Sequence, residues 1–331
     1  MRKEEKKYYI GKEAEKKREN LNMEYPINQG IITNFDYMEK IWDYCFYEEM
    51  KIDPKDHTLL ISDSPLNPKS KREKMAEIMF EKYGFPSLFL ENSSILAIYA
   101  SGRTTGIVAD IGETVSYIVP IYEGFNIPIH TKKMDIGGRD LTEYLMRLLN
   151  ERGHSFVSIS DRKIASDIKE KLCYIAYDFE EEMKNANEKK SIEKKYESMN
   201  GDFFTIGNER LKCPEMLFNP SLNGIEEKGI HEIIYESISK CDVDIRRFLY
   251  GNIILSGGSS QFPGFADRLR KEIQYLAPLT MSLKVTAPPE RSISTWIGGS
   301  IITTLSNFGN MFILKEEYEE FGIRIIGRKF F

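Results

Sequence analysis

The feature that most constrains this chain is an apolar strand that ends in a carboxylate and then turns back. Residues 105–110 read Thr-Gly-Ile-Val-Ala-Asp, which is an apolar run of strand length closed by Asp110. The tight turn Gly112-Glu113-Thr114 follows, and residues 115–121 alternate as a returning strand. The segment therefore predicts a hairpin within a buried sheet, with polar groups gathered at its turn.

Two more predicted strands end in glycine-rich turns. Residues 134–138 close a strand with a glycine pair, and an amphipathic helix is expected over 139–151. Residues 251–256 form another apolar strand, which Gly257-Gly258-Ser259-Ser260 turns toward a helix expected over 265–275. Such turns direct backbone N–H groups and the positive end of a helix toward one place, as a phosphate requires. A glycine pair can also simply turn the chain, but three converging turns favour a nucleotide site.

The rest of the chain alternates helices and strands. We expect helices over 35–50, 70–83, 93–101, 160–183 and 229–240, and strands over 57–62, 86–90 and 203–206. This alternation is typical of an α/β fold.

Composition narrows the class of protein further. The 331 residues include 46 basic and 51 acidic side chains, giving a net charge of −5 with both signs mixed along the chain. That length suits two domains, and that charge argues against a nucleic-acid partner. No apolar run approaches the roughly 18 residues that cross a bilayer, and the N-terminus lacks the apolar region of a signal peptide. We therefore expect a protein of the cytosol or nucleus without a membrane partner.

Cysteine and histidine usage gives no sign of a protein-held metal or a covalent nucleophile. The four cysteines and four histidines are scattered and show no C-x-x-C or H-E-x-x-H spacing. No serine stands in a G-x-S-x-G turn. Covalent or zinc-dependent catalysis is therefore not indicated.

Longer strings closely resemble the actin family. The matching blocks are residues 25–34, 38–42, 100–108, 119–124, 167–173, 205–210, 240–246, 255–258, 287–291 and 296–300. They occur in the order of actin and are collinear from about Tyr9 to Phe331, so the resemblance covers nearly the whole chain. It implies an actin-like ATPase fold of class α/β, with two lobes of mixed sheet plus helices, four subdomains and a central nucleotide cleft. The outer lobe would comprise residues 1–100 and 293–331, and the inner lobe residues 101–292.

The resemblance also implies ligands and a role. An actin-like cytoskeletal protein of the cytoplasm would bind ATP or ADP with Mg or Ca in the cleft and take part in actin filaments. Asp110 would face the hydrated cation through water. The other residues implied at the nucleotide are Gly112, Glu113, Thr114, Gly138, Lys169, Glu170, Gly257, Gly258, Ser259 and Phe262. The resemblance implies partners as well, namely actin or a second copy in a filament, and actin-binding proteins at a groove lined by Tyr99, Phe125, Leu305 and Phe308.

Departures from the family pattern temper these expectations. Full-length actin begins with a strand-turn-strand that carries a first phosphate-binding loop, and no such segment precedes Met1, so we expect weak ATP binding. Ser93 and Tyr117 stand where actin has a water-positioning glutamine and a nearby histidine, so we expect impaired hydrolysis. The loop that one filament subunit inserts into the next is shortened or replaced by the charged run Arg2 to Lys7, which puts longitudinal assembly in doubt. The alternative is therefore a non-polymerising actin-related interaction protein, either monomeric or filament-capping; a kinase- or chaperone-type ATPase and a truncated product are weaker options.

Overall fold

The computed structural model describes residues 8–17, 20–189, 192–198, 201–306 and 308–330. The chain forms two compact units: the first comprises residues 1–91 and 305–331, and the second comprises residues 92–304. In the part of the chain that the structure describes, no helix is both long enough and apolar enough to span a bilayer.

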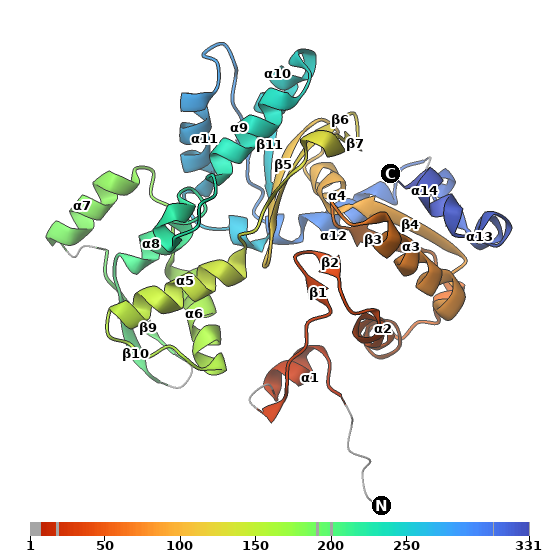
Figure 1. The fold of residues 1–331 in the computed structure, drawn as a ribbon, viewed down its shortest axis with the longest axis horizontal. Helices are drawn as coiled ribbons and strands as arrows, with labels where there is room; N and C mark the ends of the chain where they lie inside the picture. The colour runs from red at the N-terminus through yellow and green to blue at the C-terminus, as the bar shows by residue number, and fades with distance from the viewer. Residues whose placement is uncertain (1–7, 18–19, 190–191, 199–200, 307, 331) are drawn as a thin grey trace, which may run out of the picture. The chain divides into compact units, whose positions relative to one another are not determined.

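A mixed sheet lies at the centre of the second unit (Figure 1). Its strands run in the order β12-β11-β5-β6-β7, and β8 pairs with β6. Strand β11 is parallel to β5, whereas β6 is antiparallel to β5, so the predicted hairpin around residues 112–114 is confirmed. The bounds are β5 (Gly106–Ile111), β6 (Ser116–Tyr122), β7 (Phe125–Asn126), β8 (Lys132–Met134), β11 (Ile253–Ser256) and β12 (Val285–Thr286).

The two faces of this sheet differ in what they bury. Asp110 lies opposite Tyr117 and beside Ser256 in the strand register, so these three side chains share one face. Helix α4 (Ser93–Ala100) covers that face with apolar residues of its own. Ile107 and Ile111 point to the other face, into the main core of the unit. A carboxylate therefore stands at the edge of an otherwise apolar face.

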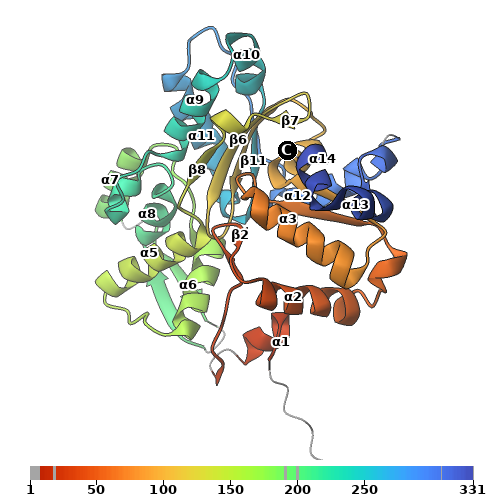
Figure 2. The ribbon, with the colours of Figure 1, turned by 45° about the vertical axis from the view of Figure 1, so that its right-hand side comes forward.

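Helices supply most of the remaining cover of the second unit. Helix α5 begins where the Gly137 N–H donates to Asp140 Oδ2 at 2.8 Å, and its apolar stripe, including Leu141 and Leu145, enters the main core. Helices α5 and α6 lie side by side (Figure 2). The elements are α5 (Gly138–Glu151), α6 (Ile159–Leu172), α7 (Phe179–Lys189), β9 (Lys194–Glu197), β10 (Phe203–Ile206), α8 (Glu209–Glu215), α9 (Ile230–Lys240), α10 (Val243–Gly251) and α11 (Phe265–Leu276).

The single helix expected over 160–183 is wrong, because the chain breaks it into α6 and α7. Cys173 already has an extended backbone, with φ −76° and ψ 148°. Beyond it, the Tyr174 N–H donates to the Arg210 oxygen at 3.2 Å and the Ile175 N–H donates to the Pro263 oxygen at 2.9 Å. These bonds to distant segments replace helical ones, and a local apolar period does not reveal them.

Helices α4 and α12 (Ser294–Ile302) pack unusually closely within the second unit. A Cβ atom at Gly298 would lie 1.7 Å from the Leu96 carbonyl oxygen, so only glycine fits there. Both helices belong to the second unit, in which they pack on each other and α4 packs on the sheet.

The first unit is built on a smaller sheet of order β13-β4-β3. The helices expected over 35–50 and 70–83 are present, although each changes to a π-helical turn, at Tyr44–Glu49 and Ile78–Tyr83. Helix α14 lies against α3 (Figure 2). The elements are α1 (Gly11–Lys16), β1 (Ile27–Asn28), β2 (Ile31–Ile32), α2 (Phe35–Asp43), β3 (Leu59–Asp63), α3 (Lys69–Glu77), β4 (Ser87–Asn92), β13 (Ile313–Leu314), α13 (Lys315–Phe321) and α14 (Ile326–Lys329).

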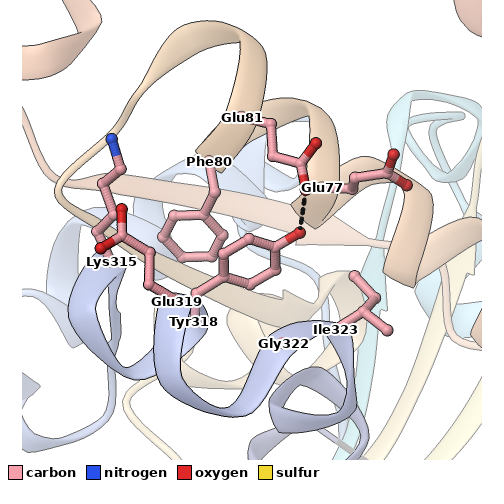
Figure 3. A pocket seen from close by; sticks show the side chains of 8 residues that line it. All are labelled: Glu77, Phe80, Glu81, Lys315, Tyr318, Glu319, Gly322 and Ile323. Atoms are coloured by element: carbon pink, nitrogen blue, oxygen red, sulfur yellow. Dashed lines mark hydrogen bonds between the residues drawn. The ribbon is translucent and has the colours of Figure 1, made fainter.

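A pocket of about 760 Å³ lies in the first unit between α13 and the π-helical turn that follows α3 (Figure 3). We call it the Glu81 pocket. Its Tyr318 ring stacks on Phe80, with ring centroids 4.6 Å apart, and the Tyr318 hydroxyl donates to Glu81 Oε1 at 2.8 Å. The lining residues are Glu77, Phe80, Glu81, Lys315, Tyr318, Glu319, Gly322 and Ile323.

Candidate functional site

The candidate site lies where β5 and β11 end in the second unit. The parallel register places Ser256, the last residue of β11, beside Asp110 near the end of β5. Ser93, the first residue of α4, also hydrogen-bonds the Asp110 carboxyl group, as Ser256 does. Burial raises the pKa of Asp110 above its ordinary value, and the two serine hydrogen bonds oppose that rise. The fold thus holds a carboxyl group at the ends of these strands, where its charged form is poorly solvated.

The turn after β11 approaches the end of β5 so closely that it needs glycine. Gly257 has φ +85°, and a Cβ atom there would lie 2.3 Å from the Ile111 oxygen and 2.8 Å from Asp110 Oδ1. Its N–H donates to the Arg291 oxygen at 2.9 Å, which fixes the turn from the other side. At Gly258, in contrast, a Cβ atom would meet nothing within 4 Å. The turn is therefore packed on one side and open on the other.

The turn of the β5–β6 hairpin joins the start of α5. The Gly138 N–H donates to the Gly112 oxygen at 3.0 Å, and the Arg139 N–H donates to the Glu113 oxygen at 2.7 Å. Ser259, from the third turn, donates through its hydroxyl to the same Gly112 oxygen at 2.9 Å. The three strand-end turns predicted from the sequence thus meet in one place, which we call the cradle: residues 112–114, 137–138 and 257–259.

Four backbone donors of the cradle have no acceptor among the residues that the structure describes. They are the N–H groups of Glu113, Thr114, Gly258 and Ser259. Thr114 and Ser259 are half-buried, whereas Glu113 and Gly258 are exposed. Two turns that each present two consecutive N–H groups without a protein acceptor are suited to binding an anion. The open space at Gly258 gives such a ligand access to these donors.

Charged side chains border the cradle. A Cβ atom at Gly138 would lie 2.5 Å from both Glu113 Oε2 and Ser259 Oγ, and 3.3 Å from Lys169 Nζ. Lys169 is only 4% exposed, and its ammonium group donates to the Gly138 oxygen at 2.8 Å and to Thr142 Oγ1 at 2.9 Å. This lysine therefore fixes the start of α5. Its neighbour Glu170 is exposed on α6 and accepts a hydrogen bond from the Ser166 hydroxyl at 3.1 Å.

Two of the predicted site residues lie within apolar cores. Phe262 is 7% exposed and belongs to the main core of the unit. Tyr117 is 4% exposed and lies in the core beneath α4, on the same face of the sheet as Asp110. Neither ring offers much surface to a ligand in this structure.

Cation binding by side chains alone has little support. Over the described ranges of the chain, no group of three or more His, Cys, Asp or Glu side chains could hold a metal ion. Asp110 is a half-buried carboxyl group beside the cradle, so a cation here would take most of its ligands from water and from a bound anion.

The family model for actin matches residues 1–331 of this chain. The chain belongs to the actin family. Its mixed α/β architecture agrees with the expected actin-like fold. Members of the actin family typically bind a nucleotide with a divalent cation and are typically cytoskeletal.

The residues expected to line a partner groove have different exposures in this actin-family chain. Phe125 is 75% exposed and Leu305 is 44% exposed. Phe308 is buried instead, in edge contact with Phe89 at 5.3 Å between ring centroids, and Tyr99 packs partly on the core beneath α4. The Arg2 to Lys7 run lies outside the described residues.

One contact beside the cradle has no signal in the local sequence. The sequence predicts Ser256 only as the end of a strand, although its side chain hydrogen-bonds Asp110. The parallel pairing of β11 with β5 could have indicated this contact, because the strand-end residues Ser256 and Asp110 then stand side by side. The support that the Arg291 oxygen gives Gly257 has no local sequence signal.

Proposed function

We propose that this chain is an actin-like cytoskeletal protein that binds ATP or ADP, with Mg²⁺ or Ca²⁺, at the cradle. The observation that carries the proposal is the set of four backbone N–H groups without acceptors, two in each of two adjoining turns. Consecutive backbone donors of this kind can bind phosphate oxygens.

The side chains around the cradle suit the other parts of a nucleotide and its cation. Asp110 would hold the hydrated cation through water, since its buried carboxyl group gains most when a positive charge is near. The carboxylates of Glu113 and Glu170 suit the hydroxyl groups of a ribose, which donate hydrogen bonds, better than they suit a phosphate. Lys169 would act by holding the Gly138 end of α5 in place.

Hydrolysis should be slow in this protein. Ser93 stands where the family places a water-positioning glutamine, and here its hydroxyl is engaged with the Asp110 carboxyl group. Tyr117 is buried, and a neutral phenol is a poor proton acceptor. Phosphate release at saturating ATP should therefore be low, and the Ser93→Gln, Tyr117→His double variant should raise it.

Calorimetric titration with MgATP tests the nucleotide site directly. A leucine at Gly258 would project into open space, so Gly258→Leu should fold normally but weaken ATP binding by about tenfold or more. Gly251→Leu is the matched control, because a Cβ atom there also meets nothing within 4 Å, and the position lies at the end of α10. Equal affinities of the two variants and the unchanged protein would refute a nucleotide site at the cradle.

Membership in the actin family makes actin, or a second copy of this chain, the expected class of partner. We propose that the protein takes part in actin filaments, and that exposed Phe125 of the second unit contributes to a surface for actin-binding proteins. Sedimentation in polymerising salt, with and without actin, separates this role from that of a non-polymerising interaction protein. Failure to sediment in either case would favour the second role.

A further inference from the structure

The side chain of Arg291 adds a second support to the turn that follows β11. Its guanidinium group donates through Nε and Nη2 to the Ser260 main-chain oxygen, at 3.2 and 3.0 Å, and through Nε to Ser260 Oγ at 3.1 Å. Ser260 is fully buried, so water does not compete for these bonds. The main-chain oxygen of Arg291 accepts from the Gly257 N–H at 2.9 Å. One residue therefore holds both ends of the turn.

The two ends that Arg291 holds enclose a pair of unpaired donors of the cradle. The N–H groups of Gly258 and Ser259 have no acceptor among the residues that the structure describes, and these two residues lie between Gly257 and Ser260 in the chain. Bonds within the turn restrain it as well, because the Ser260 hydroxyl and N–H both donate to the Gly257 oxygen, at 2.7 and 3.1 Å. With both flanking residues tied, the two free N–H groups keep their direction.

The charge of Arg291 is not neutralised by a carboxylate. Its Nη1 donates to the Pro288 oxygen at 2.9 Å and to the Ala287 oxygen at 3.5 Å, so all its acceptors are neutral carbonyl and hydroxyl oxygens. Within the described part of the chain, no carboxylate lies at salt-bridge distance from it. Burial lowers the pKa of this guanidinium group, although arginine stays charged in proteins. An anion bound at the adjoining turn would be attracted by this charge.

We propose that Arg291 is a positioning residue for the phosphate groups of the nucleotide, a role that rests on the nucleotide site proposed above. It acts through Gly257 and Ser260, and so keeps the Gly258 and Ser259 N–H groups directed at the ligand. Donors that are already in place need no ordering when the ligand binds, which favours tighter binding. The planar guanidinium group suits this task, because two of its N–H groups reach one oxygen, whereas a lysine ammonium group acts as a point charge.

Calorimetric titration with MgATP and with adenosine separates positioning from a general loss of structure. Arg291→Met keeps the main-chain oxygen that Gly257 needs and removes every side-chain bond to Ser260. It should weaken binding of MgATP about tenfold or more, but that of adenosine less than about twofold, because adenosine has no phosphate. Arg291→Lys should bind MgATP with intermediate affinity, since it keeps the charge and can donate to the Ser260 oxygen.

Arg246 supplies the matched control. It is also half-buried and donates to a main-chain oxygen, that of Cys241 at 2.9 Å, but it lies on α10. Arg246→Met should bind MgATP as the unchanged protein does. Equal MgATP affinity in Arg291→Met and the unchanged protein, or an equal loss for MgATP and adenosine, would overturn the role of Arg291 alone. Failure of the unchanged protein to bind MgATP would instead refute the nucleotide site, and the role of Arg291 with it.

Hydrogen exchange in the nucleotide-free protein provides a second measurement that does not depend on ATP. Mass spectrometry follows a peptide that covers residues 257–261. Its amides should exchange about tenfold faster in Arg291→Met than in the unchanged protein, because the turn opens more often once the bonds to Ser260 are lost. The same peptide should be unaffected in Arg246→Met. Equal exchange in all three proteins would show that the Arg291 side chain does not hold the turn, and would overturn the proposal.

Discussion

The cradle of the second unit and the Glu81 pocket of the first unit both contain acidic side chains, yet they differ in unused hydrogen-bonding capacity. In the Glu81 pocket, Glu81 accepts from the Tyr318 hydroxyl and Glu77 accepts from Lys74 at 2.9 Å. In the cradle, four backbone donors have no acceptor within the described part of the chain. The volume of a pocket does not by itself indicate a ligand site. Unpaired hydrogen-bond donors are a better indication, because a bound molecule can accept from them.

The largest expected difference between the two regions concerns a glycine in each. Gly257 and Gly322 both have positive φ, +85° and +62°, and replacement by alanine strains either backbone by about 1–3 kcal/mol. Only Gly257 also faces a clash, with the Ile111 oxygen at 2.3 Å, whereas nothing lies within 4 Å at Gly322. Urea unfolding should therefore show a loss of about 3 kcal/mol or more for Gly257→Ala and a smaller loss for Gly322→Ala. Equal losses would show that the cradle is not tightly packed.

A smaller difference is expected when one carboxyl group in each region is neutralised. Burial raises the pKa of Asp110, so the folded protein favours the protonated carboxyl group. The stability that this group contributes is therefore fully present below its ordinary pKa of 3.8, and it is lost as the pH rises through the raised pKa and the carboxyl group ionises. Asp110→Asn should therefore stabilise the nucleotide-free protein at pH 7, by about 1–2 kcal/mol, and the gain should fade toward pH 4. Glu81→Gln keeps an acceptor for Tyr318, so its effect at pH 7 should be small.

Denaturation of Asp110→Asn across this pH range supplies the measurement for that comparison. The same variant should weaken binding of MgATP, because it removes the carboxylate that faces the cation. A variant that gains no stability at pH 7, or one that gains as much at pH 4, would contradict a desolvated Asp110.

The smallest effect is expected from Tyr318→Phe in the Glu81 pocket. This change removes one hydrogen bond to Glu81 and keeps the ring that stacks on Phe80, so it should cost about 0.5–1 kcal/mol. Urea unfolding measures the loss, and ATP affinity should not change. Weaker ATP binding in this variant would connect the pocket to the cradle and remove the contrast between them.

The sequence predicted the cradle better than it predicted the chain around it. Each of the three turns has a local signal, a strand followed by glycines, and Gly257 shows why: its backbone conformation excludes other residues. The break between α6 and α7 has no such signal, since it depends on the oxygens of Arg210 and Pro263.

The close fit of α12 on α4 also affects when this protein can finish folding. Thr295 Oγ1 donates to the Ser93 oxygen across 202 positions of sequence, and Gly298 makes its contact with Leu96 over a similar separation. During synthesis, α4 therefore waits for its partner until most of the chain has left the ribosome. Ordering such a distant pair costs loop entropy before any contact is gained, which makes folding slow. Throughout that interval the apolar surface of α4 is open to other chains, so aggregation competes with folding until residue 302 has emerged.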